Sequence, residues 1–129
     1  MKKILLAEDD EDDQEIFREI LSSINSEIQL SIFENGEELV KYMTSLSPDA
    51  LPDLIVMDQN MPRLKGSEAI SQLRDHVRFA HIPMVIYTTY HDSKFEQHCK
   101  TLGIELLLKP DTFGVLKSMI QDLIERYTK

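Results

Sequence analysis

The sequence contains a single cysteine and is short of basic residues, and each deficit excludes a class of protein. One cysteine excludes a disulfide within the chain and is consistent with a reducing compartment. Lys and Arg number 14 against 23 Asp and Glu, so the formal net charge is −9 and the pI is near 4.8. A phosphate backbone repels such a chain, which argues against nucleic acid as a partner.

Long apolar runs are also missing. After the basic start Met1–Lys3, only Ile4–Ala7 are apolar before acidic residues begin. That run is too short for the core of a signal peptide, and no other stretch is long and apolar enough to span a bilayer. We therefore expect a soluble, cytoplasmic protein without a membrane partner.

Length and composition indicate a single globular domain. The chain has 129 residues, of which 42% are hydrophobic and 29% are charged. A chain of this size can bury a core without disulfides or other staples. The sequence shows no internal repeat or linker, and the last helical pattern continues almost to Lys129. We expect one domain over residues 1–129, with no room for a second.

Four continuous apolar runs and one alternating run predict five strands. Runs of about four apolar residues are typical of parallel strands that are covered on both faces. These runs are Ile4–Ala7, Leu54–Met57, Met84–Tyr87 and Leu106–Leu108. The segment Ile28–Ile32 alternates apolar and polar residues, which indicates a strand at the edge of the sheet.

Apolar residues at three- and four-residue spacing predict a helix after each strand. The members of these stripes are Ile16, Phe17, Ile20, Leu21 and Ile24; Leu39, Met43 and Leu46; Ile70, Leu73 and Val77; Phe95, Cys99 and Leu102; and Val115, Leu116, Met119, Ile120, Leu123, Ile124 and Tyr127. Strands that alternate with helices predict an α/β fold, a doubly wound five-stranded parallel sheet with five helices on both faces.

Candidate capping residues support the predicted helix boundaries. Asn35, followed by Glu38, and Ser93, followed by Glu96, have the spacing of capping boxes. Gly103 follows the fourth helical stripe, at a position where glycine is favoured because it adopts a left-handed conformation. These residues predict where the second and fourth helices begin and where the fourth ends.

Polar and charged side chains directly follow four of the predicted strands. In strand order they are Glu8 and Asp9, Asp58, Thr88, and Lys109. Ligands bind beyond the carboxyl ends of the strands in such sheets, so we expect these side chains to meet. The carboxylates would repel one another in an empty site, and Mg²⁺ prefers such oxygen ligands. A metal, an ammonium, a hydroxyl donor and a carboxylate nucleophile together can stabilise a transferring phosphoryl group.

Each of these residues also has an ordinary explanation. Residues 8–13 are six consecutive acids, of which Glu11, Asp12 and Asp13 can be a solvated helix start, because acids there complement the helix dipole. Asp58 alone could be a turn residue, Lys109 a surface lysine, and Thr88 a residue that favours strands. Their joint placement, each directly after its own strand, makes a shared site the better interpretation.

Four segments carry motifs that stand together in one known family. They are Ile4–Asp10, Asp53–Pro62 with Gly66, Ile82–Thr88, and Lys109–Pro110. The combination resembles the CheY-like receiver domain of two-component response regulators and covers essentially the whole chain. The resemblance implies a flavodoxin-like sheet with strand order 2-1-3-4-5. It also implies a signalling domain that catalyses only its own phosphorylation and dephosphorylation. Because the last helical pattern continues almost to Lys129, we expect no output domain.

The resemblance assigns the phosphoacceptor and the metal ligands. Asp58 would accept a phosphoryl group from a phosphohistidine on a sensor histidine kinase or a histidine phosphotransfer protein. Mg²⁺ would be bound directly by Asp9, through water by Glu8, and by Asp58. The backbone carbonyl of Asn60 would complete the set of protein ligands.

The resemblance also implies how phosphorylation would be read. Lys109 would contact the phosphoryl group, and Thr88 would rotate toward a phosphoryl oxygen and begin a conformational switch. The Lys109–Pro110 peptide bond would be cis, which proline makes tolerable. The switch would alter the surface of the fourth helix, fifth strand and fifth helix, where a downstream protein would bind.

Some positions depart from the usual pattern of the family. Glu8 replaces the more frequent Asp and keeps its charge. Leu106, three residues before Lys109, replaces the usual aromatic switch residue, for which Tyr87 or Tyr90 is a candidate substitute. Tyr90 is also expected to screen the site from water and to give the phosphoryl group a lifetime of minutes or longer.

Two other classes of protein use similar chemistry or architecture. A phosphatase of the haloacid-dehalogenase type also has an Asp nucleophile after a strand, but it needs a second Asp two residues later, where this chain has Asn60. A flavin-binding module needs a phosphate-binding loop after the first strand, where residues 8–13 are acidic and repel phosphate. Turnover of phosphoesters would distinguish the phosphatase from a receiver.

Overall fold

A computed structural model describes residues 2–25, 27–89 and 92–128 and contains the predicted alternation of strands and helices. The strands are β1 (Lys3–Ala7), β2 (Gln29–Phe33), β3 (Leu54–Met57), β4 (Met84–Thr88) and β5 (Glu105–Leu108). The helices are α1 (Glu11–Ile24), α2 (Gly36–Ser45), α3 (Gly66–Arg74), α4 (Ser93–Leu102) and α5 (Phe113–Tyr127), and short 3-10 turns lie at Pro48–Ala50 and Val77–Phe79. Within the described residues, none of the helices has the length and hydropathy needed to cross a membrane.

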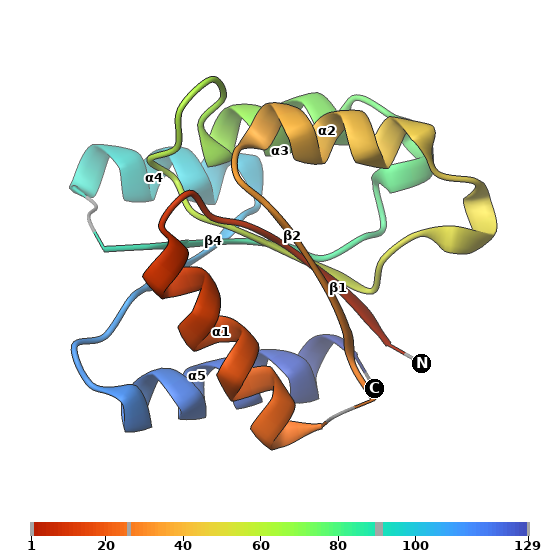
Figure 1. The fold of residues 1–129 in the computed structure, drawn as a ribbon. Helices are drawn as coiled ribbons and strands as arrows, with labels where there is room; N and C mark the ends of the chain where they lie inside the picture. The colour runs from red at the N-terminus through yellow and green to blue at the C-terminus, as the bar shows by residue number, and fades with distance from the viewer. Residues whose placement is uncertain (1, 26, 90–91, 129) are drawn as a thin grey trace.

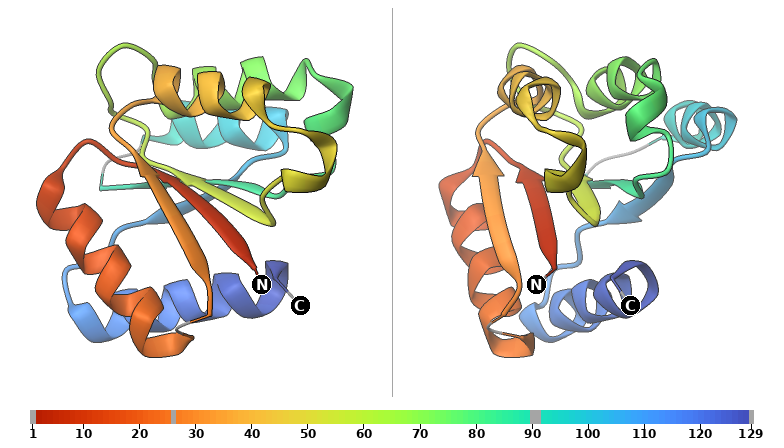
Figure 2. Two further views of the ribbon diagram at one scale, coloured as in Figure 1. Left: turned by 45° about the vertical axis from the view of Figure 1, so that its right-hand side comes forward. Right: turned by 90° about the vertical axis from the view of Figure 1, so that its right-hand side faces the viewer.

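The strands form one parallel sheet in the order β2-β1-β3-β4-β5. Helices α1 and α5 cover one face, and α2, α3 and α4 cover the other (Figures 1 and 2). The predicted fold class and the strand order implied by the resemblance are therefore confirmed. The alternating segment forms β2 at one edge of the sheet, as expected.

Two hydrophobic cores explain why the central strands are apolar at every position. Side chains at alternate positions of β1 and β3, such as Leu5 and Ile55, pack against α2, α3 and α4. Their neighbours, such as Ile4 and Val56, pack against α1 and α5. A strand covered on both faces needs apolar residues on both, which produces the continuous runs in the sequence.

Backbone hydrogen bonds of the sheet continue one residue beyond three of the strands. The N–H of Glu8 donates to the carbonyl of Phe33 at 2.9 Å, and the N–H of Asp58 donates to the carbonyl of Ala7 at 2.9 Å. The N–H of Lys109 donates to the carbonyl of Thr88 at 2.8 Å. The polar residues that follow the strands are thus held by the sheet itself.

Two apolar segments are less buried than their patterns predict, and so is Val115 of the fifth helical stripe, which lies in α5 and is 57% exposed. The run Leu106–Leu108 lies in β5, the second edge strand, where Leu106 is half-buried and Leu108 is 45% exposed. Val77 lies beyond the end of α3 and is 91% exposed, so its assignment to the third helical stripe is wrong. Both differences arise because the apolar pattern does not show where the covering layer of helices ends.

The capping predictions are confirmed at Asn35 and Gly103 and wrong at Ser93. The Asn35 side chain accepts from the N–H of Glu38 at 2.9 Å, and Gly103 has φ of 68° at the end of α4. Helix α4 instead begins after Asp92, whose carboxylate accepts from the N–H of Phe95 at 2.7 Å. An N-cap carboxylate reaches the N–H three residues on, and Asp92 makes this bond one residue earlier in the chain.

The Lys109–Pro110 bond is trans, and the expectation of a cis bond is wrong. A trans bond is the intrinsically favoured form even before proline. In this conformation the backbone N–H of Lys109 remains bound to Thr88, and its side chain still reaches the carboxyl edge of the sheet.

Candidate functional site

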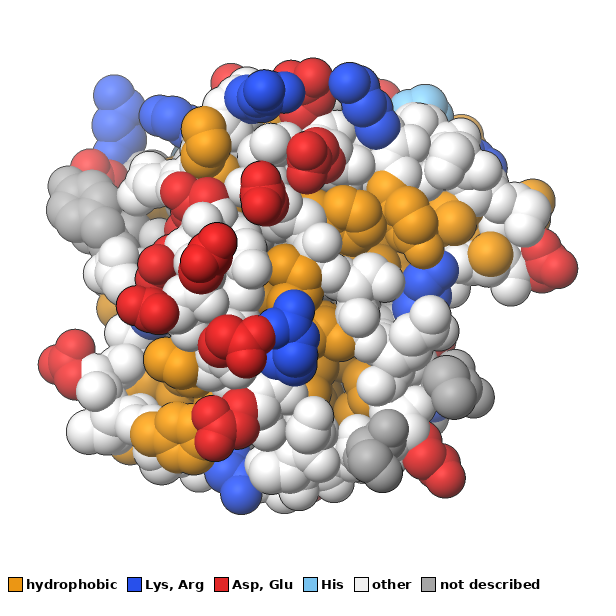
Figure 3. Space-filling view, in the orientation of Figure 1, with side chains coloured by type: hydrophobic (Ala, Val, Ile, Leu, Met, Phe, Trp, Pro, Cys, Tyr) orange, Lys and Arg blue, Asp and Glu red, His pale blue; other side chains and the backbone are white. Residues whose placement is uncertain are grey.

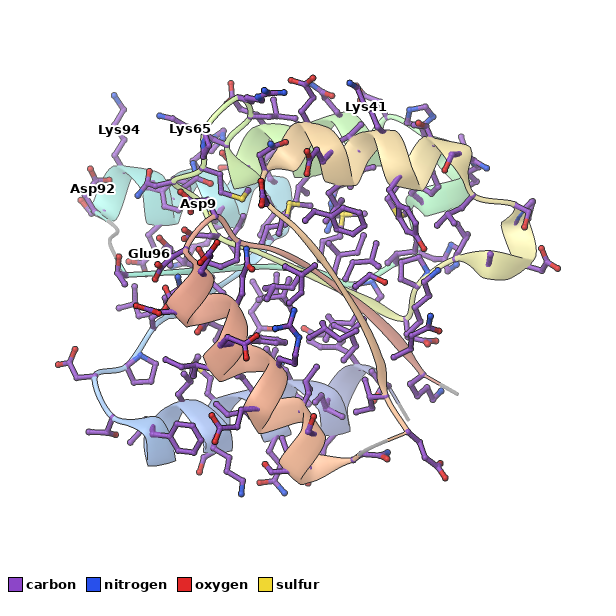
Figure 4. The ribbon with its side chains drawn as sticks, in the orientation of Figure 1. Asp9, Lys41, Lys65, Asp92, Lys94 and Glu96 are labelled. Atoms are coloured by element: carbon purple, nitrogen blue, oxygen red, sulfur yellow. The ribbon has the colours of Figure 1, made fainter. Side chains whose placement is uncertain are left out.

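Three carboxylates meet at the carboxyl edge of the sheet. Oxygen atoms of Glu8, Asp9 and Asp58 lie within 4.8 Å of one another. Glu8 is 1% exposed and Asp58 is 8% exposed, whereas Asp9 is open to solvent where β1 passes into α1 (Figure 4). The predicted meeting of these residues is confirmed, with two acids in the floor of the site and one at its rim.

Lys109 places an ammonium group among these acids. Its Nζ donates to Oε1 of Glu8 at 2.5 Å and to Oδ2 of Asp13 at 2.9 Å. The same nitrogen is 3.9 Å from Oδ1 of Asp58. The side chain of Lys109 is 8% exposed, and its Nζ lies 4.8 Å from the centre of the Tyr87 ring. The cation is therefore buried and is bound mainly to Glu8 and Asp13.

Asp58 lies between a backbone donor and a buried hydroxyl. Its Oδ1 accepts from the N–H of Gln59 at 2.9 Å. The hydroxyl of Thr88, at the end of β4, is close enough to lower the pKa of Asp58 but makes no hydrogen bond of normal geometry within the described residues. A buried hydroxyl without a partner costs about 1–3 kcal/mol, so an incoming oxyanion would gain a donor there.

The buried acids are difficult to ionise without a further cation. Burial raises the pKa of Glu8 to about 7, against the opposing effect of Lys109. Burial also raises the pKa of Asp58, although Lys109 lowers it. Burial by itself lowers the pKa of Lys109, but its bonds to Glu8 and Asp13 outweigh this and raise it above its ordinary value. Closely spaced carboxylate oxygens with raised pKa values are a donor set that fits a hard divalent cation.

Acidic side chains also gather outside the site. Figure 3 shows them over the start of α1, where Glu11 and Asp12 are exposed. The interpretation of these residues as a solvated helix start is confirmed, but it does not hold for Asp13. Asp13 binds Lys109 and was missed by the sequence analysis. No local pattern singles out Asp13, because Asp9 precedes the helix and Asp13 shares the first turn of α1 with Glu11 and Asp12.

A second polar contact missed from the sequence fixes the loop after Asp58. The side-chain amide of Gln59 accepts from the N–H of Ser67 at 2.8 Å and donates to its hydroxyl at 3.0 Å. Both residues are buried. This pair ties the loop to the start of α3. Asn60 follows in the same loop and is exposed at its surface, and its carbonyl remains a predicted metal ligand.

Of the two tyrosines that could replace the aromatic switch residue, Tyr87 lies in the part of the chain that the structure describes. Tyr87 is buried in the core beneath α1 and α5, whereas Leu106 packs against the core beneath α2, α3 and α4. The ring of Tyr87 packs edge-on against Phe17, with ring centres 6.0 Å apart. Tyr87 thus does not take the place of Leu106. Tyr90 lies outside the described residues, and its expected screening of the site stays a prediction.

The substitution Glu8→Gln is expected to make the free energy of unfolding depend less on pH. The pKa of Glu8 rises from 4.5 to about 7 on folding, so the folded protein binds more protons than the unfolded chain between these values. The free energy of unfolding therefore falls as the pH rises through this range, by at most about 3 kcal/mol from this group. Urea unfolding in EDTA, followed by circular dichroism at about pH 5 and about pH 8, measures the difference.

The control for this experiment is Glu11→Gln, the same chemical change at an exposed position of α1. Glu11→Gln should retain the wild-type decline in stability between the two pH values, and Glu8→Gln should show a smaller decline. An equal decline in both variants would contradict the assignment of the effect to the buried carboxyl group.

Comparison with known proteins agrees with the geometry. The family model described as the response regulator receiver domain matches residues 4–121. The sensor histidine kinase TmoS of Ectopseudomonas mendocina is 28% identical over 123 residues, which are 95% of this chain and 12% of that protein. The polar-differentiation response regulator DivK of Brucella anthropi is 26% identical over 126 residues, which are 94% of this chain and 98% of DivK.

The response regulator Rcp1 of Synechocystis sp. is similar in both sequence and structure. It is 28% identical over 94 residues, which are 70% of this chain and 64% of Rcp1. The crystal structure of its Mn²⁺-bound form has a TM-score of 0.85 at 25% identity and covers 97% of this chain and 93% of that chain. In the sequence comparison the chain thus spans less than two thirds of TmoS and of Rcp1, and almost all of DivK. Because the family model matches most of the chain, this protein belongs to the response regulator receiver domain family.

Proposed function

We propose that residues 1–129 act as one receiver domain that takes a phosphoryl group onto Asp58 from a phosphohistidine. The donor is a sensor histidine kinase or a histidine phosphotransfer protein. The observation that carries this proposal is the set of groups around Asp58. Two further carboxylates and the ammonium of Lys109 lie beside it, together with the buried Thr88 hydroxyl that lacks a hydrogen-bond partner among the described residues.

In the transfer, a carboxylate oxygen of Asp58 attacks the phosphorus atom. A P–O bond forms and the P–N bond of the phosphohistidine breaks, with its electron pair left on the imidazole nitrogen, which then takes a proton from water. Thr88 and Lys109 are both next to Asp58, so each can donate to a phosphoryl oxygen, Lys109 after a short movement of its ammonium from 3.9 Å. Donors directed at the oxygens where charge develops are the main source of catalysis in such sites.

Mg²⁺ is the proposed cofactor, bound by the side chains of Glu8, Asp9 and Asp58 and by the carbonyl of Asn60. When bound, it would neutralise charge on the phosphoryl oxygens and on the acids that hold it. The raised pKa values of Glu8 and Asp58 support this assignment, since both carboxylates are destabilised by burial. The Mn²⁺-bound structure of Rcp1 supports a divalent cation in a related domain.

The proposed readout is the surface formed by α4, β5 and α5, where a downstream protein would bind. A hollow of about 400 Å³ between α4 and β5 supports this choice. It is lined by Cys99, Ile104, Leu106 and Leu108, with Glu96 and Lys100 beside them. Thr88 would connect the site to this surface, because it pairs with Leu108 across β4 and β5.

The substitution Asp58→Asn tests the phosphoacceptor. The wild-type protein incubated with phosphoramidate and Mg²⁺ should gain one phosphoryl group, measured as intact mass, because a carboxylate nucleophile is available. Asp58→Asn should gain none, and EDTA should prevent the gain in the wild type. Asp12→Asn, the same change at an exposed position of α1, should be labelled like the wild type.

Two results would contradict this assignment. One is an unchanged mass gain in Asp58→Asn, which would place the phosphoryl group on another residue. The other is steady turnover of a phosphoester substrate, which would support a phosphatase. A phosphatase of the haloacid-dehalogenase type needs a second Asp where this chain has Asn60.

A further inference from the structure

We propose that Asp13 is a positioning residue that holds the ammonium of Lys109 toward α1 and so slows its movement to the phosphoryl group on Asp58. The inference rests on the proposed function and concerns the same site. It assigns a role to an acid that lies outside the metal-binding cluster of Glu8, Asp9 and Asp58.

The distances show which acids hold the ammonium. Nζ of Lys109 is 2.9 Å from Oδ2 of Asp13 and 2.5 Å from Oε1 of Glu8, both within hydrogen-bond distance. It is 3.9 Å from Oδ1 of Asp58, which is outside that distance. Lys109 must therefore move to come within hydrogen-bond distance of Asp58, and this movement changes the geometry of its two existing bonds.

The burial of Glu8 and Asp13 indicates which of their two hydrogen bonds to Lys109 breaks. The side chain of Glu8 is 1% exposed, so water cannot replace Lys109 as its partner. The side chain of Asp13 is 31% exposed and borders a hollow of about 420 Å³ that Lys109 also lines. Water can solvate the Asp13 carboxylate after Lys109 leaves, whereas the buried Glu8 carboxylate is closed to water. The bond to Asp13 is accordingly the one that is exchanged.

The position of Asp13 distinguishes it from the neighbouring acids. Asp12 and Asp13 both lie in the first turn of α1 and carry the same charge, but Asp12 is exposed and Asp13 contacts Lys109. Removing either charge changes the general attraction of the site for Mg²⁺ and for an anionic phosphodonor. Only removal of Asp13 changes how Lys109 is held, so Asp12→Asn is a matched control for Asp13→Asn.

The experiment measures labelling by phosphoramidate as intact mass over time, with the phosphodonor and Mg²⁺ varied separately. Asp13→Asn should raise the maximal labelling rate about tenfold above that of Asp12→Asn, because one charge-assisted hydrogen bond no longer has to break. The half-saturating Mg²⁺ concentration should change equally in the two variants. Asp13→Glu retains the charge and should return the maximal rate to near the wild-type value.

The outcomes separate this inference from the proposed function. Equal maximal rates in Asp13→Asn and Asp12→Asn, or a slower rate in Asp13→Asn, would overturn the role of Asp13 while leaving wild-type labelling intact. An Asp13→Glu variant as fast as Asp13→Asn would also overturn it. Failure of the proposed function gives a different result, because the wild type itself would then not be labelled at Asp58.

Discussion

Replacing Gly66 with alanine should lower the free energy of unfolding by about 3 kcal/mol or more. A Cβ atom at this position would lie 2.4 Å from the carbonyl oxygen of Asp58 and 2.8 Å from Cδ1 of Ile86. Ile86 is fully buried, and the backbone of Asp58 is held by β1. Neither neighbour can move without displacing the loop that follows Asp58. Urea unfolding followed by circular dichroism measures the loss.

Gly114 provides the control for this prediction. It lies in the first turn of α5, and a Cβ atom there would have nothing within 4 Å. Gly114→Ala should therefore stabilise the protein by about 0.5–1 kcal/mol, the usual gain in a helix. The account of Gly66 is wrong if Gly66→Ala is as stable as Gly114→Ala, because the close approach to Asp58 would then not constrain the loop.

The second large effect is expected for Lys109→Met in the absence of a divalent cation. Methionine retains the apolar length of the side chain, but Glu8 and Asp58 lose the cation that lowers their pKa values. Removing one partner of a buried ion pair costs about 3–5 kcal/mol. The loss should be smaller at about pH 5 than at about pH 8, because protonation removes the charge of the unpaired acids.

Urea unfolding with EDTA and with Mg²⁺ tests this prediction. Mg²⁺ should stabilise Lys109→Met more than the wild type, since the metal supplies the missing positive charge. Lys94→Met removes the same charge from the exposed start of α4 (Figure 4) and should have little effect. A loss in Lys109→Met no larger than that in Lys94→Met would show that Lys109 does not stabilise the acids.

Much of the fold could be predicted because local patterns reflect burial on each face of the sheet. β3 matches the predicted run Leu54–Met57 in both bounds, since its residues are buried on both faces. Prediction was weaker at β5, where the apolar run did not reveal that Leu108 is 45% exposed. An apolar side chain indicates that burial is favourable at its position, but it does not show which helix or strand covers it.

The site could be predicted in part for a similar reason. In a parallel sheet, the residues that follow the strands share one edge, and this brings Glu8, Asp58 and Lys109 together from distant parts of the chain. The helix cap at Asp92 and the trans bond before Pro110 were not predicted, because each depends on the tertiary contacts of a loop.

By itself the amino-acid sequence determined the alternation of strands and helices and the kind of side chain that follows each strand. Only the tertiary structure decided that Lys109 binds Asp13, 96 residues away, more closely than Asp58. The physical reason is that strand and helix periodicities are local, whereas the partner of a buried charge depends on how α1 packs beside the end of β5. A difference of about one ångström between two N–O distances, invisible in any sequence pattern, sets which acid holds the ammonium.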